Sequence, residues 1–173
     1  MRLEYSWTLL LTLLLALLLS VAPLPEFMEK GRPLWLALTL SYWVLHCPHR
    51  VGLATAWMLG LAEDVLYGTV LGQNAFILVL VCVLMRLLEP RFRVAAMWQQ
   101  CVMVLVVMGV SQLVQLWLLA LTSTPPPVAP FMLPALVSAL LWPWVCVALR
   151  AGQHCAQPLL TAFSALVFGL AYM

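Results

Sequence analysis

Six apolar segments, most of them long enough to cross a membrane as helices, constrain this chain more than any other feature. They cover residues 5–22, 33–47, 51–67, 70–88, 94–121 and 131–149. A bilayer core about 30 Å thick requires roughly 20 apolar residues per helix, and an open strand in lipid would leave its backbone groups unpaired. The pattern therefore predicts an all-α integral membrane protein, a bundle of six transmembrane helices.

The composition agrees with a protein that lipid solvates. Hydrophobic residues make up 65% of the 173 residues and charged residues only 8%, too few charges to cover a water-soluble globule of this size. The formal net charge is +2 and no basic run occurs, so nothing points to nucleic-acid binding. The five cysteines lack the spacing of a zinc site and are interpreted as small apolar core residues, without disulfides.

Residues 1–155 are interpreted as the bundle and residues 156–173 as an apolar tail. The first segment resembles a secretory signal, but Pro23 directly follows the only small-residue site, which favours a retained helix. Residues 158–173 carry no charge and are short for a crossing. We expect an interfacial or partly inserted helix there, with a seventh crossing as the alternative.

The lysines and arginines predict the orientation of the bundle. With the N-terminus inside, only Lys30 and Arg32 fall outside. The cations on the cytoplasmic side are then Arg2, Arg50, Arg86, Arg91, Arg93 and Arg150. Because loops rich in lysine and arginine stay in the cytoplasm, we expect a multi-pass protein of the inner membrane whose N-terminus is cytoplasmic.

The third segment carries a small or acidic residue at every fourth position, so that these residues share one helix face. They are Gly52, Ala56, Gly60, Asp64 and Gly68, and Gly72 lies in the connection that follows. Small residues on such a face let a neighbouring backbone approach closely. We interpret the row as a packing seam within the bundle, with a surface for another protein as the alternative.

Two carboxylates and two glutamines are the candidate polar sites. Glu63 and Asp64 are consecutive and point about 100° apart on a helix, so they do not face a common substrate. We expect Asp64 to accept hydrogen bonds from the turn at residues 67–72 or from another helix; a proton relay is the alternative. For Gln112 and Gln115 we expect contacts between helices, with Asp64 or Asn74 as candidate partners.

The remaining candidates are features of a turn and a kink. His49 and Arg50 belong to the cytoplasmic turn after the second segment. His49 and the nearby His46 are two histidines without a third ligand, so they make a weak metal site. Pro143, between Trp142 and Trp144, predicts a kink because proline removes a helical hydrogen bond. The chain carries none of the common catalytic motifs, so we expect no enzyme activity, cofactor or metal.

Several short motifs follow one another along the chain. They are Arg32-Pro33-Leu34-Trp35, Tyr42-Trp43, Pro48-His49-Arg50-Val51, Gly60-Leu61-Ala62-Glu63-Asp64-Val65 with Gly68, Leu71-Gly72, Trp98-Gln99-Gln100 and Leu141-Trp142-Pro143-Trp144. In this order they resemble the rod shape-determining MreD family of rod-shaped proteobacteria. The resemblance covers about residues 5–150; each motif alone is weak, but the ordered set in a six-segment chain is specific.

The resemblance implies a non-enzymatic inner-membrane scaffold that maintains rod shape within the cell-wall elongation machinery. Its partners, by family, are the bitopic protein MreC, filaments of the actin-like MreB, and the glycan polymerase RodA with its class B transpeptidase. The family's bundle is expected to be similar to the substrate-binding membrane subunits of vitamin importers. The uncharged tail after Pro158 departs from the short polar end usual in the family.

The alternative function is that of a small-solute binding membrane subunit of a transporter. Such a protein needs an outward pocket with several convergent polar groups. The outer half of the predicted bundle offers few, chiefly Asp64, Gln73, Asn74, Gln112 and Gln115. The scaffold is therefore the first interpretation.

Overall fold

The structure is a computed structural model that describes residues 4–21, 33–48, 50–122 and 131–151. These residues form helices and no strand, which confirms the predicted all-helical class. The helices are α1 (Glu4–Val21), α3 (Trp35–His46), α4 (Leu53–Tyr67), α5 (Gln73–Phe92), α6 (Met97–Thr122) and a last helix, Leu133–Ala151.

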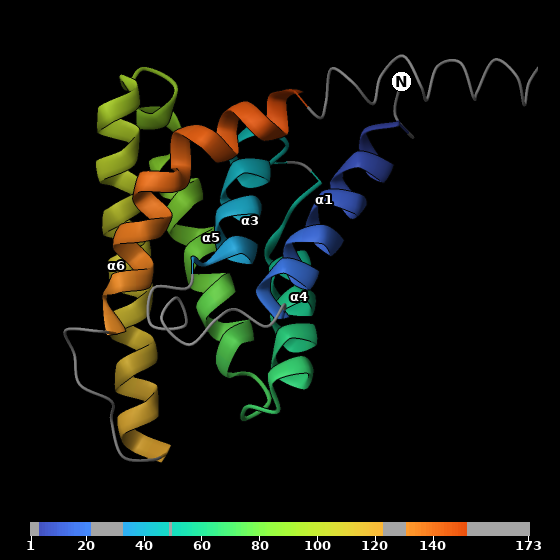
Figure 1. Cartoon of the computed structure of the whole chain (residues 1–173), viewed down its shortest axis with the longest axis vertical. Coiled ribbons are helices and arrows are strands. Elements are labelled where there is room, and N and C mark those ends of the chain that lie inside the picture. The colour runs from blue at the N-terminus through green and yellow to red at the C-terminus, as the bar shows by residue number, and fades with distance from the viewer. Residues whose placement is uncertain (1–3, 22–32, 49, 123–130, 152–173) are drawn as a thin grey trace, which may run out of the picture.

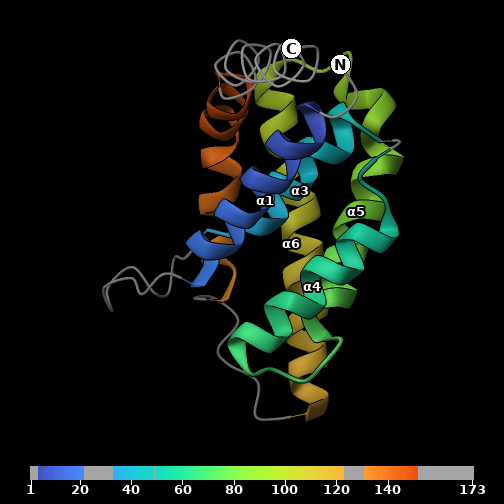
Figure 2. The same cartoon turned by 90° about the vertical axis from the view of Figure 1, so that its right-hand side faces the viewer.

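The described helices alternate in direction. The start of α1 and the end of the last helix lie at the same end of the molecule as the turn between α5 and α6, which we call the α5–α6 end (Figure 1). The turn that joins α4 to α5 lies at the opposite end, the α4–α5 end (Figure 2). α5 packs against α3, α4 and α6, and α1 packs against α3.

The helix boundaries differ by a few residues from those of the predicted segments. The helices expected to begin at residues 70 and 94 begin at Gln73 and Met97, because Val70 and Val94, although apolar, belong to exposed turns. α5 ends at Phe92 rather than at residue 88 and includes Pro90. The predicted segment stops at Leu88 because the charged residues Glu89 and Arg91 follow, but the backbone hydrogen bonds of a helix do not require apolar side chains.

α3 lies at the centre of the hydrophobic core. All of its residues from Leu36 to Val44 are buried, as expected of a helix that is apolar on every side. The indole nitrogen of Trp43 donates a hydrogen bond to Thr12 Oγ1 of α1 at 2.9 Å. With 12 residues, α3 is about 18 Å long. The second predicted span is thus a short helix enclosed by its neighbours.

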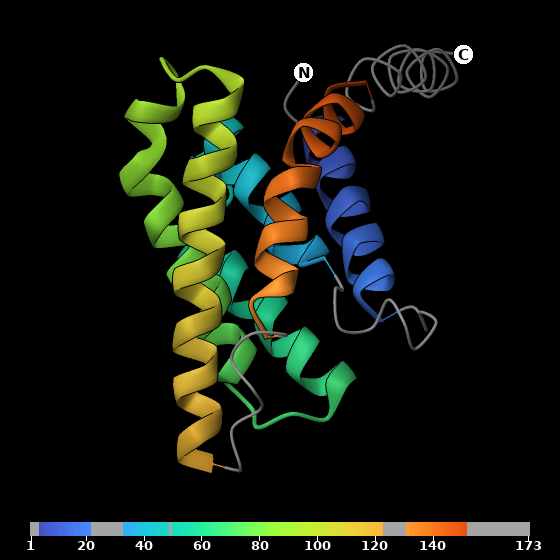
Figure 3. The ribbon, with the colours of Figure 1, turned by 60° about the vertical axis from the view of Figure 1, so that its left-hand side comes forward.

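Two of the described helices are long and apolar enough to cross a membrane. They are Met97–Leu121 in α6, with a mean hydropathy of 2.2, and Leu133–Ala151, with 1.6. Figure 3 shows these two helices side by side. Leu113 and Trp117 of α6 are exposed, so one face of this helix points away from the core.

The last helix is bent, as Figure 1 shows, and Pro143 lies near the middle of its sequence. Proline has no amide hydrogen for the preceding turn of a helix. Trp142 is buried and packs edge-on against Phe92 with ring centroids 6.2 Å apart, whereas Trp144 is exposed. The predicted interfacial tail, residues 156–173, lies outside the described residues.

Candidate functional site

α4 and α5 pack together along the small-residue face of α4. Ala56, Gly60 and Asp64 are the buried residues of α4. A Cβ atom added at Gly60 would lie 2.2 Å from the Cα atom of Ala75 in α5, far inside the closest contact between carbon atoms. Only glycine fits at this crossing, so this face of α4 is turned toward α5 rather than toward the surroundings.

The carboxylate of Asp64 accepts four hydrogen bonds, and the residue is only 1% exposed. Oδ1 accepts from Thr69 Oγ1 and from the Asn74 amide, both at 2.9 Å. Oδ2 accepts from the amides of Gly72 at 2.8 Å and Ala75 at 3.4 Å. These amides begin α5 and have no partner within it, so an acid on α4 caps the next helix. We call these five residues the Asp64 cap.

Two glycines give the α4–α5 turn the shape that the Asp64 cap needs. Gly68 ends α4 with φ of 64°, and Gly72 precedes α5 with φ of 98°. Residues with side chains rarely adopt this left-handed region. The amides of Gly68 and Thr69 both donate to the backbone carbonyl of Asp64, which closes the end of α4. The turn thereby brings the start of α5 back over Asp64.

Weaker contacts extend from the Asp64 cap to α6. Gln115 Nε2 donates to Asn74 Oδ1 at 3.4 Å, and Asn74 Nδ2 donates to Thr69 Oγ1 at 3.5 Å. Gln115 thus reaches Asn74, one of the two candidate partners. Gln112 is buried and Glu63 is half-buried, but neither belongs to the Asp64 cap.

The hydrogen bonds of Asp64 determine what this carboxylate can do chemically. All four partners are N–H or O–H donors of the protein itself, and each oxygen receives two of them. A proton relay or a cation site needs a carboxylate oxygen within reach of a second carrier or of the ion. The arrangement instead fixes α4 and α5 against each other.

Arg86 joins the connection between α3 and α4 to α5. Its Nη2 donates to the carbonyl oxygens of Pro48 at 2.7 Å and Val51 at 3.1 Å. From the sequence, Arg86 is predicted only to be one of the cytoplasmic cations that set the orientation of the bundle. The feature that could have indicated a structural role is its position as a cation inside an apolar segment. Of the predicted turn residues, Arg50 is exposed, and His49 lies outside the described residues.

Gln100 connects three helices near the α5–α6 end. Its Nε2 donates to the carbonyl oxygens of Phe92 at 3.3 Å and Ala95 at 3.1 Å. Its Oε1 accepts a long hydrogen bond, 3.5 Å, from Trp142 Nε1 of the last helix. Two motifs more than 40 residues apart, Trp98-Gln99-Gln100 and Trp142-Pro143-Trp144, are therefore in contact, although nothing in the sequence pairs them.

Comparisons with known proteins cover all of the described helices. A family model for the rod shape-determining protein MreD matches residues 1–151. The Rod shape-determining protein MreD of Haemophilus influenzae is 31% identical over 154 residues, which span 86% of this chain and 93% of that protein. The chain belongs to the MreD family. The family resemblance noted in the sequence is thereby confirmed.

The MreD match contains the Asp64 cap, Arg86 and Gln100, and it ends where the last described helix ends. No solved structure matches the chain. The likeness to importer subunits that the resemblance implied therefore stays a prediction.

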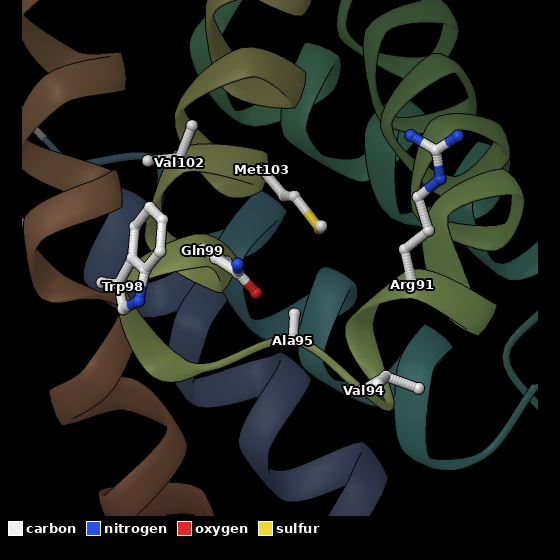
Figure 4. A pocket seen from close by; sticks show the side chains of 7 residues that line it. All are labelled: Arg91, Val94, Ala95, Trp98, Gln99, Val102 and Met103. Carbon is white, nitrogen blue, oxygen red and sulfur yellow. The ribbon is translucent and has the colours of Figure 1, made fainter.

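This MreD-family chain also has an open cavity of about 450 Å³ at the α5–α6 end. Its lining residues are Arg91, Val94, Ala95, Trp98, Gln99, Val102 and Met103. Figure 4 shows Arg91 on one side of the cavity and Trp98 on the other, with Gln99 and Met103 between them. None of the site residues predicted from the sequence lines this cavity.

Proposed function

We propose that this MreD-family protein is a non-enzymatic, multi-pass scaffold of the bacterial inner membrane. In this proposal it maintains rod shape as part of the cell-wall elongation complex. The family match over residues 1–151 carries the proposal. The Asp64 cap supports it, because the buried carboxylate stabilises the helix pair and presents no unoccupied oxygen to a substrate.

Exposed apolar faces on two helices support a membrane location. On α1 they comprise Leu10, Leu11, Leu14, Leu15 and Leu18, and on α6 Val102, Val106, Val110, Leu113 and Trp117. In water, faces of this kind drive association or aggregation. In lipid the same side chains are solvated by acyl chains, and a helix satisfies its own backbone.

The described arginines support a cytoplasmic N-terminus. Arg91, Arg93 and Arg150 lie at or next to the ends of α5 and of the last helix. These two helices end at the α5–α6 end, where α1 also begins (Figure 1). Around the α4–α5 turn, residues 53–74 contain Glu63 and Asp64 but no lysine or arginine. Because cytoplasmic loops concentrate positive charge, the α5–α6 end is the cytoplasmic one in this proposal.

The proposed partners are those of the family: MreC, MreB filaments, and RodA with its class B transpeptidase. A bitopic partner such as MreC crosses the membrane as a single helix. The exposed apolar face of α1 gives such a helix a surface on which to pack. A scaffold of this kind needs no reaction chemistry of its own.

Depletion of the protein in a rod-shaped host tests the proposal. We expect rods to become spheres, and we expect MreC to co-purify with the full-length protein from solubilised membranes. Uptake of individual nutrients should be unchanged. Rods that persist after complete depletion, verified by immunoblot, would contradict the scaffold. Loss of one nutrient's uptake in cells that stay rod-shaped would instead favour a transporter subunit.

A further inference from the structure

The cavity at the α5–α6 end holds a positive charge that no described residue neutralises. Arg91 lines the cavity, and its guanidinium group makes no hydrogen bond or ion pair with the described residues. Arg93, two residues further on, is paired with Glu89 at 2.7 Å. No carboxylate is among the lining residues. The charge of Arg91 is therefore available to a ligand.

The same cavity opens onto an apolar stripe of α6. Trp98, Val102, Val106 and Val110 follow one another at intervals of four residues, so they share one face of the helix, and all four are exposed. Trp98 and Val102 line the cavity, and the others continue the stripe away from the turn. A ligand seated here would meet a cation at one end and an apolar surface along the rest.

We propose that this groove binds an anionic phospholipid of the cytoplasmic leaflet, an inference that rests on the proposed membrane location. The phosphate would lie at Arg91, whose guanidinium suits phosphate oxygens. Gln99 points into the cavity (Figure 4), and its Oε1 accepts the Ala96 amide at 3.1 Å, which leaves its Nε2 as a second donor.

The rest of the groove fits the other parts of such a lipid. An acyl chain would follow Val102, Val106 and Val110, and the Trp98 indole would lie at headgroup level, where tryptophan concentrates. The unneutralised charge of Arg91 favours a headgroup with net negative charge over a zwitterionic one. An acidic peptide would match the cation but not the uninterrupted apolar stripe.

Lipid binding to the full-length protein in detergent, followed by native mass spectrometry, tests this inference. Arg91→Gln should weaken phosphatidylglycerol binding about tenfold, the effect of losing one charge-assisted contact, and should leave phosphatidylethanolamine binding unchanged. Arg93→Gln is the matched control, because it removes a cation from the same turn outside the cavity and should change neither. Trp98→Ala should weaken the binding of both lipids.

Three outcomes would overturn the inference. Equal losses of phosphatidylglycerol binding in Arg91→Gln and Arg93→Gln would show that the lipid is attracted to any positive charge at this turn and not to the cavity. Unchanged phosphatidylglycerol binding in Arg91→Gln would show that the cavity does not select the headgroup. Loss of a co-purifying acidic protein with unchanged lipid binding would assign the groove to a peptide. If the variants still restore rod shape, any of these results leaves the scaffold proposal intact. If the full-length protein is absent from the membrane fraction, both proposals are contradicted.

Discussion

At the α4–α5 end four donors converge on one buried carboxylate. At the α5–α6 end, by contrast, Arg91 lines an open cavity, and its guanidinium group has no partner among the described residues. At the first end, both oxygens of the Asp64 carboxylate are hydrogen-bonded within the protein. The second exposes a cation beside large apolar side chains such as Val94 and Trp98. The Asp64 carboxylate thus serves the internal geometry of the bundle, whereas the Arg91 side chain is accessible to the surroundings.

The difference explains why the two ends carry different kinds of motif. Gly60, Asp64, Gly68 and Gly72 are each required by a distance or a backbone angle. Such positions tolerate almost no substitution, because a Cβ atom or a lost acceptor disturbs two helices at once. At the α5–α6 end the exposed side chains are not constrained by packing, so substitutions there should change binding more than folding.

The largest expected effect is the separation of the two ends by a membrane. Val70 in the α4–α5 turn is 62% exposed and Val94 in the α5–α6 turn is 90% exposed. In intact cells, a membrane-impermeant thiol reagent should label Val70→Cys; Val94→Cys should react only after permeabilisation. The unsubstituted protein supplies the background from native cysteines. Labelling of Val94→Cys alone in sealed cells would reverse the orientation, and labelling of both would contradict the separation.

Asp64→Leu should have the largest effect on stability, because it leaves four donors without their acceptor. An unsatisfied buried donor costs about 1–3 kcal/mol, so we expect a loss of about 3 kcal/mol or more in the free energy of unfolding. Asp64→Asn keeps one oxygen but turns its amide group toward two donors, and should lose about half as much. Thermal unfolding in detergent measures both losses.

Glu63→Gln is the comparison for Asp64, since Glu63 is the adjacent carboxylate outside the Asp64 cap. It should change stability less than either Asp64 variant. A proton relay predicts a different pattern, in which Asp64→Asn folds normally and co-purifies with MreC but does not restore rod shape. That result would contradict the structural role of Asp64.

Gly60→Ala should destabilise the α4–α5 pair by about 1–3 kcal/mol, the usual cost of forcing extra volume into a packed interface. The added Cβ would overlap the backbone of Ala75, which cannot rotate away as a side chain can. Gly109→Ala in α6 is the matched control, because a Cβ atom there has no neighbour within 4 Å. It should be neutral or stabilising. Equal loss of stability in the two variants would contradict the close approach.

The sequence predicts the helices well and their surroundings less well. Apolar runs bounded by charges place every described helix within a few residues. They do not show that α3 is surrounded by protein, because lipid and a protein core select the same side chains. They also place the start of α5 too early, at residue 70 instead of Gln73, since Val70 and Leu71 are apolar residues of an exposed turn.

The Asp64 cap shows where prediction from sequence stops. Spacing puts Asp64 on the glycine face and near a turn that supplies donors. It does not reveal that half of the donors are amides of α5, because these depend on the left-handed angles at Gly68 and Gly72. Arg86 and Gln100 are missed for a related reason: both donate to backbone carbonyls, which leave no trace in the side-chain pattern.

The smallest expected effect concerns Thr69, the one side-chain donor in the Asp64 cap. Thr69→Val keeps the shape but removes the hydroxyl, and should lower the free energy of unfolding by about 1 kcal/mol, the net value of one hydrogen bond. Thr69→Ser retains the hydroxyl and should lose less. Because three backbone amides still hold the carboxylate, the turn should persist in both. Thermal unfolding of Thr69→Val and Asp64→Leu under the same conditions compares their losses in the free energy of unfolding. Equal losses would mean that the Thr69 hydroxyl, and not the amides at the start of α5, holds Asp64 in place.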